Sequence, residues 1–200
     1  MCQKRFFSLL VLSIFLTPTI RAKDLSSSNR SKSANTLITS IYKRLHSGYS
    51  SSVRNQKEFI GAKTNATYGE ITYEGAQSLF SELDLSASDV FYDLGSGVGR
   101  LVVQAYLTTA AKKVVGVELS TLRAEQAQKA LENMRGQGLV NDPRKLIFIQ
   151  GDLLEVALED ATAIFICNTT FSTELKRKIS AKLAKLKSGL KVVTMKKLHS

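Results

Sequence analysis

Apolar positions along the chain recur with two spacings, which predict an alternation of helices and strands. Helical spacing predicts five helices, over residues 37–45, 74–83, 100–109, 120–135 and 173–187. Compact apolar runs predict five strands, over residues 90–94, 113–117, 145–150, 162–167 and 191–195. Because strands and helices mostly alternate, we expect an α/β fold with a doubly wound, mostly parallel sheet.

The first 36 residues stand apart from this alternation. Lys4 and Arg5 precede an apolar run over residues 6–16, which is followed by Pro18 and Ala22. This order is typical of a secretory signal peptide, and the run is shorter than the roughly 18 residues of a transmembrane helix. We therefore expect export, with an organelle-targeting peptide, or a nuclear location if the segment is not cleaved, as alternatives. The expected organisation is a targeting segment (1–22), a Ser-rich linker (23–36), an accessory helix and loop (37–66) and the main domain (67–200).

The formal net charge of +11 is unevenly distributed. Residues 1–60 carry +8, residues 61–165 carry −5 and residues 166–200 carry +8. An acidic centre between basic ends is expected if the centre binds a cationic ligand and the ends contact a polyanion such as DNA; well-solvated ends are the alternative. The two cysteines and two histidines exclude a disulfide framework and do not form a Cys/His zinc pattern.

A glycine-rich loop follows the first central strand. Gly95, Gly97 and Gly99 are spaced two and two apart, whereas a dinucleotide fingerprint spaces its glycines two and then three apart. Asp93 precedes them, and its carboxylate would repel a pyrophosphate but attract an ammonium or a sulfonium. This combination favours S-adenosyl-L-methionine over NAD as the cofactor.

Two further acidic residues follow the next strands, and all three acids are expected at one edge of the sheet. Glu118 ends the second strand, where it can accept the ribose hydroxyls. Asp152 follows the third strand and can accept the adenine amino group, while Leu153 lies on the ring. The carboxyl ends of parallel strands are where open α/β sheets bind ligands.

These motifs resemble a known family, the non-SET histone-lysine methyltransferases of the disruptor-of-telomeric-silencing type. The resemblance covers residues 66–198 and rests on five segments: Tyr68-Gly69-Glu70, Phe91 to Gly99, Gly116-Val117-Glu118, Gly151-Asp152-Leu153 and Phe165 to Phe171. It implies a Rossmann-like class I methyltransferase that uses S-adenosyl-L-methionine to methylate a protein lysine, with histone H3 lysine 79 in nucleosomes as the implied substrate. It also implies that Tyr68 and Glu70 fold over the cofactor and that Asn168, Phe171 and Tyr68 are catalytic.

The sequence departs from the family pattern at three places. Cys167 replaces the first of two asparagines, Ile71 replaces a hydroxyl residue, and no counterpart of two closing strands follows residue 195. We expect Cys167 to be inert, Phe171 to form a wall of the lysine channel and Asn168 and Thr169 to form its polar lips. The alternatives are a methyltransferase for another protein or a small molecule, and an inactive cofactor-binding or nucleic-acid-binding module.

Overall fold

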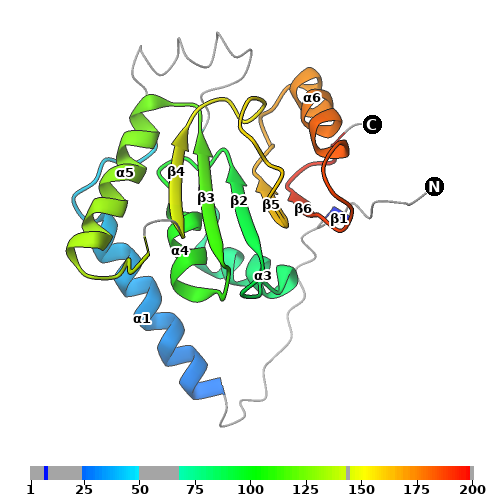
Figure 1. The fold of residues 1–200 in the computed structure, drawn as a ribbon. Coiled ribbons are helices and arrows are strands. Elements are labelled where there is room, and N and C mark those ends of the chain that lie inside the picture. Colours follow the sequence, from blue (N-terminus) through cyan, green and yellow to red (C-terminus); the bar gives the residue numbers. More distant parts are fainter. Residues whose placement is uncertain (1–6, 9–23, 50–67, 143–144, 199–200) are drawn as a thin grey trace.

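The computed structural model describes residues 7–8, 24–49, 68–142 and 145–198, with side chains described from residue 33 onward. The elements follow the predicted alternation (Figure 1): β1 (Phe7–Ser8), α1 (Asp24–Tyr42), α3 (Tyr73–Leu83), β2 (Val90–Leu94), α4 (Arg100–Thr108), β3 (Lys113–Glu118), α5 (Thr121–Gly136), β4 (Leu146–Gln150), β5 (Ala163–Ile166), α6 (Thr173–Ala184) and β6 (Lys191–Thr194).

The strands form one sheet in the order β1-β6-β5-β2-β3-β4, and neighbouring strands are parallel throughout. After β1 at one edge, the chain enters the centre of the sheet at β2, winds outward through β3 and β4, and then returns to wind the other way through β5 and β6. The prediction of a doubly wound sheet is therefore confirmed. Its switch point lies between β2 and β5, where open α/β sheets bind ligands.

Two features at the beginning of the chain differ from the sequence-based expectations. Helix α1 begins at Asp24, so it includes most of the segment 23–36 that we predicted as a linker. Ser lowers helix propensity only modestly, and neither Gly nor Pro interrupts residues 24–47. In addition, β1 lies within the predicted targeting segment, where Phe7 pairs with Val193 of β6.

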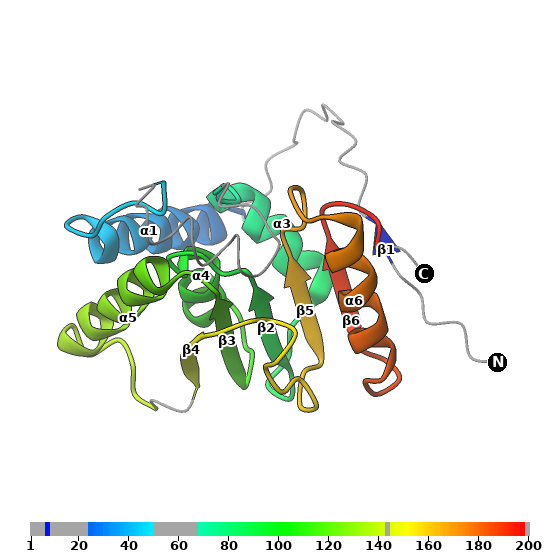
Figure 2. The ribbon, with the colours of Figure 1, turned by 90° about the horizontal axis from the view of Figure 1, so that it is seen from above.

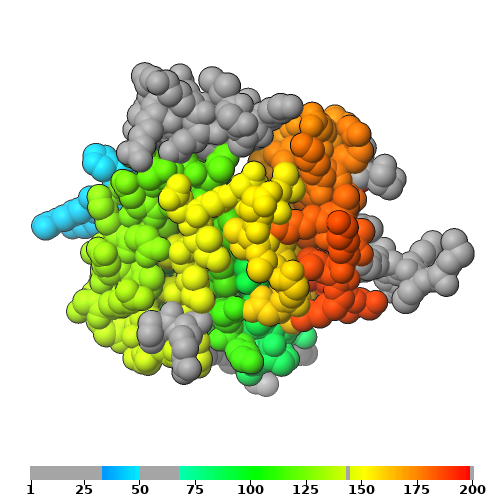
Figure 3. Space-filling view, turned by 45° about the horizontal axis from the view of Figure 1, so that its top comes forward, coloured from blue at the N-terminus to red at the C-terminus, as the bar shows by residue number. Residues whose placement is uncertain are grey.

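Helices cover both faces of the sheet. Figure 2 shows α1, α3, α4 and α5 on one side and α6 on the other, and Figure 3 shows the segment that joins β4 to β5 (yellow) beside α6 (orange). Consecutive strand residues alternate between the two cores: Phe91 packs with the first set of helices, whereas Tyr92 packs with α6. None of the described helices is long and apolar enough to span a membrane.

Helix α4 begins differently from its neighbours. Helices α3, α5 and α6 each begin after a Ser or Thr whose hydroxyl accepts a backbone N–H of the first turn. Helix α4 instead follows Gly99, which has a φ of 86° and provides no side-chain cap. The glycine loop thus leads directly into the N-terminus of a helix at the switch point of the sheet.

Candidate active site

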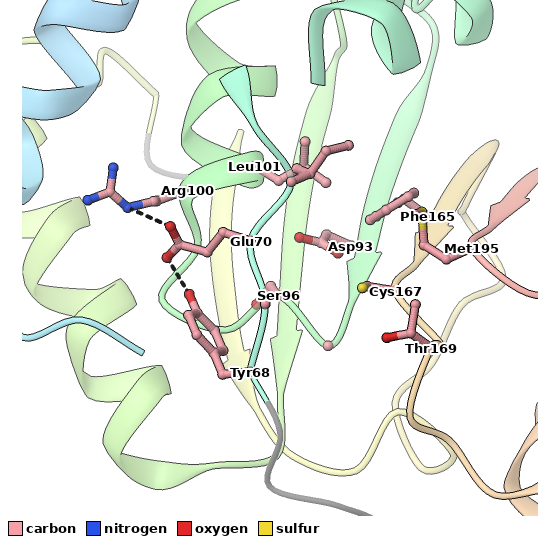
Figure 4. A pocket seen from close by; sticks show the side chains of 13 residues that line it. Tyr68, Glu70, Asp93, Ser96, Arg100, Leu101, Phe165, Cys167, Thr169 and Met195 are labelled. Carbon is pink, nitrogen blue, oxygen red and sulfur yellow. Dashed lines mark hydrogen bonds and ion pairs between the residues drawn. The ribbon is translucent and has the colours of Figure 1, made fainter. Parts of the chain in front are cut away.

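A cavity of about 270 Å³ opens at the switch point of the sheet. Figure 4 shows Asp93 between two walls: Tyr68, Glu70 and Arg100 lie on one side, and Phe165, Cys167, Thr169 and Met195 on the other. The remaining lining residues are Gly69, Ile71, Gly95, Ser96 and Leu101. Segments far apart in the sequence, before α3, after β2 and after β5 and β6, therefore meet at one site.

Two polar side chains in this cavity have no hydrogen-bond partner among the described residues. The carboxylate of Asp93 is 3% exposed, and its burial, together with the charge of Glu118, raises its pKa to about 8. The Oγ atom of Ser96 is buried and makes no hydrogen bond. Buried polar groups rarely remain unpaired, because desolvation without a hydrogen bond costs free energy. Both groups therefore fit a ligand that brings a positive charge and a hydrogen-bonding atom.

The three glycines of the loop serve different purposes. All have positive φ, but only Gly95 is exposed, and a Cβ built on it would have Phe171 Cζ as its nearest neighbour at 4.0 Å. A Cβ on Gly97 would lie 2.4 Å from Tyr68 Cε2, and one on Gly99 would lie 2.4 Å from Phe148 Cε1. We predicted that all three glycines belong to a loop that binds the cofactor. The structure leaves ligand space at Gly95, whereas Gly97 and Gly99 make room for the protein's own aromatic rings.

Glu118 holds the glycine loop in place. Its carboxylate is 5% exposed and accepts the Gly97 N–H at 2.8 Å and the Ser120 N–H at 2.9 Å. It therefore ties the loop to the beginning of α5, a role that the sequence did not suggest. Its expected contact with a ribose stays a prediction.

Asp152 and Leu153 follow β4 at the same edge of the sheet. Asp152 Oδ1 accepts the Leu154 N–H at 2.8 Å, which shapes the turn. Neither of them, nor Glu118, is among the described residues that line the cavity. Their predicted adenine contacts therefore stay a prediction about an adjoining part of the site.

The segment Tyr68-Gly69-Glu70 is fastened over the cavity, as its predicted position requires. The Tyr68 hydroxyl donates to Glu70 Oε1 at 2.5 Å, and Glu70 Oε2 lies 3.4 Å from Arg100 Nε (Figure 4). The Arg123 guanidinium stacks 4.5 Å from the centre of the Tyr68 ring and donates to the Gly48 carbonyl at 3.1 Å. Burial and the hydrogen bond to Glu70 raise the pKa of Tyr68, so the phenol stays neutral. Neither Arg100 nor Arg123 was predicted from the sequence, because the only signal of each is its position in the first turn of a helix after a central strand.

The wall of the cavity that carries Cys167 and Thr169 differs from the lysine channel that we predicted. Asn168 is fully buried, and its side chain bonds the backbone of Lys196, so it is an internal clamp and not a lip of the channel. Phe171 is half-buried, packs against the core that includes α6 and is not among the described residues that line the cavity. Thr169 lines the cavity as expected, together with Cys167 and with Met195, which we had not predicted. Burial raises the pKa of the Cys167 thiol, which supports its inert assignment.

The parallel fold and the cavity at its switch point fit a class I, S-adenosyl-L-methionine-dependent methyltransferase. The chain belongs to the family described as Histone methylation protein DOT1, whose model matches residues 42–200. The described residues contain no group of three or more His, Cys, Asp or Glu that could hold a metal ion.

Similar proteins agree with this assignment. The chain is 37% identical over 143 residues to a histone-lysine N-methyltransferase, H3 lysine-79 specific, from Caenorhabditis elegans, covering 68% of this chain and 15% of that protein. It is 29% identical over 166 residues to the Yarrowia lipolytica enzyme of the same name, covering 80% and 33%. The chain thus spans a third or less of these relatives. An RNA methyltransferase from Salinibacter ruber, solved with S-adenosyl-L-homocysteine, has a TM-score of 0.51 and 28% identity, with 63% of this chain and 76% of that chain covered.

Proposed function

We propose that this protein is a protein-lysine methyltransferase that acts on histone H3 at a site equivalent to lysine 79. The observation that carries the chemistry is the unpaired, buried carboxylate of Asp93 in a cavity at the switch point. Membership in the DOT1 family and the names of the similar proteins from Caenorhabditis elegans and Yarrowia lipolytica support the substrate.

The cofactor side of the cavity is the one bounded by Asp93, Ser96 and the exposed Gly95. When bound, S-adenosyl-L-methionine supplies an electrophilic methyl group on a positively charged sulfur. Asp93 offers the only carboxylate among the described lining residues that is buried, because Glu70 is exposed. Asp93 would therefore stabilise a cation there. Tyr68 and Glu70 cover this side, and Glu118, Asp152 and Leu153 are proposed to hold the ribose and the adenine.

The acceptor side is the wall formed by Phe165, Cys167, Thr169 and Met195. A free lysine has a pKa near 10.4, so about one amine in a thousand is neutral near pH 7.4, a cost of roughly 4 kcal/mol. Phe165, Cys167 and Met195 provide an apolar surface that disfavours the ammonium by desolvation. Met195 is 45% exposed, so this wall continues to the mouth, where we expect the amine to lose its proton to water. The residues thus orient the amine and lower the cost of its neutral form.

The experiment is transfer of radiolabelled methyl from S-adenosyl-L-methionine by the full chain to nucleosomes, free core histones and a total protein extract. We expect label on nucleosomal H3, lost in Asp93→Asn, which removes the charge but keeps the shape. Asp84→Asn is the matched control, because Asp84 is exposed and its left-handed backbone (φ 44°) suits asparagine. Label on other proteins alone would contradict the histone substrate, and cofactor binding without any transfer would indicate an inactive module.

We also propose that α6 contacts DNA phosphates, through fewer residues than its sequence suggested. Six basic residues lie along α6 and just past its end: Lys176, Arg177, Lys178, Lys182, Lys185 and Lys187. Lys178 pairs with Glu174 at 3.0 Å, and Lys182 bonds backbone carbonyls of the protein itself. Arg177 and Lys185 are exposed and are the best candidates. Their joint change to Gln is expected to weaken nucleosome binding and its salt dependence while leaving cofactor binding intact; unchanged nucleosome binding and salt dependence would contradict the contact.

Export stays a separate proposal, which rests on the sequence of residues 1–22. N-terminal sequencing of the mature protein from the producing cell tests it. Cleavage after Ala22 and recovery outside the cell are expected. An uncut N-terminus on protein recovered from the nucleus would contradict export.

A further inference from the structure

The connection from β4 to β5 is the least regular part of the sheet edge that carries the site. In the strand order, β3 and β2 lie between β4 and β5, so residues 151–162 pass both strands. These residues are all described and form turns, with no helix. Their carbonyl groups therefore lack the partners that a crossover helix would provide, and other groups have to satisfy them.

Lys182, in the third turn of α6, satisfies three of these carbonyl groups. Its ammonium donates to the carbonyl of Leu153 at 3.0 Å, to that of Leu154 at 2.7 Å and to that of Val156. An ammonium has three N–H donors, so this arrangement uses all of them. Burial lowers the pKa of this ammonium, and the negative charges of Glu155, Glu159 and Asp152 partly offset that effect. The side chain is thus an internal crosslink between α6 and the connection.

This crosslink connects the turn proposed to hold the adenine with the helix that follows the acceptor wall. Its first carbonyl belongs to Leu153, and the preceding residue, Asp152, fixes the same turn through the Leu154 N–H at 2.8 Å. Helix α6 begins at Thr173, just after the segment that carries Cys167 and Thr169. We propose that Lys182 is a positioning residue that holds the Asp152-Leu153 turn in place for the cofactor. This inference rests on the proposed function, which assigns the turn to the adenine.

The test compares Lys182→Met with Lys178→Met in the full chain. Both variants remove one ammonium from α6, one turn apart, but among the described residues Lys178 pairs with the exposed Glu174 and not with the connection. Binding of S-adenosyl-L-homocysteine by calorimetry is expected to weaken about tenfold in Lys182→Met, because a disordered turn has to be ordered on binding. Lys178→Met is expected to bind as the unchanged chain does. Lys182→Arg should recover part of the affinity, since it keeps the charge but has a planar donor fork.

Two further readouts separate positioning from general damage to the fold. In methyl transfer, KM for the cofactor should rise while kcat at saturating cofactor stays within about twofold, because the acceptor wall is untouched. In hydrogen exchange without ligand, amides of residues 153–158 should exchange faster in Lys182→Met, while those of β2 and β3 stay protected. Normal affinity and normal exchange in Lys182→Met would overturn the role of Lys182. No binding by the unchanged chain would instead contradict the proposed function, and exchange would still report the crosslink.

Discussion

The side chain of Asn168 and the backbone of Lys196 form a reciprocal pair of hydrogen bonds just beyond the ends of β5 and β6. Asn168 Nδ2 donates to the Lys196 carbonyl at 2.6 Å, and Asn168 Oδ1 accepts the Lys196 N–H at 2.7 Å. Ile166 pairs with Thr194 in the sheet, so both residues lie two positions past that pair. The asparagine amide therefore extends the pairing of the two strands and fixes Met195 in the acceptor wall.

We expect Asn168→Ala to lower the free energy of unfolding by about 2 kcal/mol, because both backbone groups of Lys196 lose their partners. Urea denaturation measures this loss. Lys196→Ala is the control: it keeps the backbone pair and removes only the bond from Nζ to the Thr169 carbonyl, so its loss should be about 1 kcal/mol or less. Unchanged stability of Asn168→Ala together with a complete loss of turnover would show that Asn168 acts on the substrate directly.

Most of the sheet could be predicted from the sequence, because buried parallel strands are continuous apolar runs. The predicted strand over 90–94 coincides with β2, and the other four differ by one residue at an end or at both ends. The beginning of α1 could not be predicted in the same way. The Ser-rich part of this helix lacks apolar periodicity. Strand β1 was not predicted either, because its two residues are too few to form a pattern.

The site was predictable where a residue's position in the fold determines its role. Asp93, Gly95, Tyr68 and Glu70 line the cavity as expected. The side-chain direction of Asn168 depends on the pairing of β5 with β6, which periodicity does not reveal. The hydrogen bonds from Lys182 to the connection between β4 and β5 could not be predicted either, since a lysine on an amphipathic helix is ordinarily solvated.

Gly97 is expected to tolerate no side chain, for a reason distinct from ligand binding. Its φ of 57° strains any other residue, and an added Cβ would lie 2.4 Å from Tyr68 Cε2. We expect Gly97→Ala to lower the free energy of unfolding by about 3 kcal/mol. Gly95 has a similar strain, with a φ of 92°, but an added Cβ would lie 4.0 Å from its nearest neighbour. We therefore expect Gly95→Ala to lower the free energy of unfolding by only about 1 to 2 kcal/mol.

A double-mutant cycle with Tyr68→Ala measures the steric part. Removing the ring should relieve the clash, so the combined loss in Tyr68→Ala/Gly97→Ala is expected to be smaller than the sum of the single losses. Gly95→Ala should show no such coupling with Tyr68→Ala. Additive losses for the Gly97 pair would mean that backbone strain alone excludes a side chain at this position.

The buried Ser96 hydroxyl is expected to lower the free energy of unfolding of the protein without ligand. Its Oγ is buried and has no hydrogen-bond partner among the described residues, so its desolvation is not compensated. Ser96→Ala should therefore raise the free energy of unfolding by about 1 kcal/mol, as measured by urea denaturation without ligand. The same variant should weaken binding of S-adenosyl-L-homocysteine. A destabilised Ser96→Ala that binds the cofactor normally would assign the hydroxyl a structural role.

The raised pKa of Asp93 makes stability depend on pH. The carboxyl has a pKa of about 8 in the folded protein against an ordinary value of 3.8, so the folded state retains a proton that the unfolded chain loses. Stability from this group is therefore greatest below pH 4 and decreases as the pH rises toward 8, by about 1.4 kcal/mol per pH unit in between. Asp93→Asn should lack this dependence and should be more stable than the unchanged chain at pH 7.5. Denaturation of both proteins from pH 5 to 8.5 measures the difference, and parallel profiles would contradict it.

The same titration should appear in cofactor binding, with the opposite sign. A cationic ligand favours the carboxylate, so binding of S-adenosyl-L-methionine at pH 7 has to release the Asp93 proton, and affinity should rise with pH until about 8. Calorimetry in buffers of different ionisation enthalpy counts that proton, with up to one released by the unchanged chain and none by Asp93→Asn. S-adenosyl-L-homocysteine lacks the sulfonium charge, so it should release fewer protons. Equal release by the two ligands would show that the carboxylate does not face the sulfur.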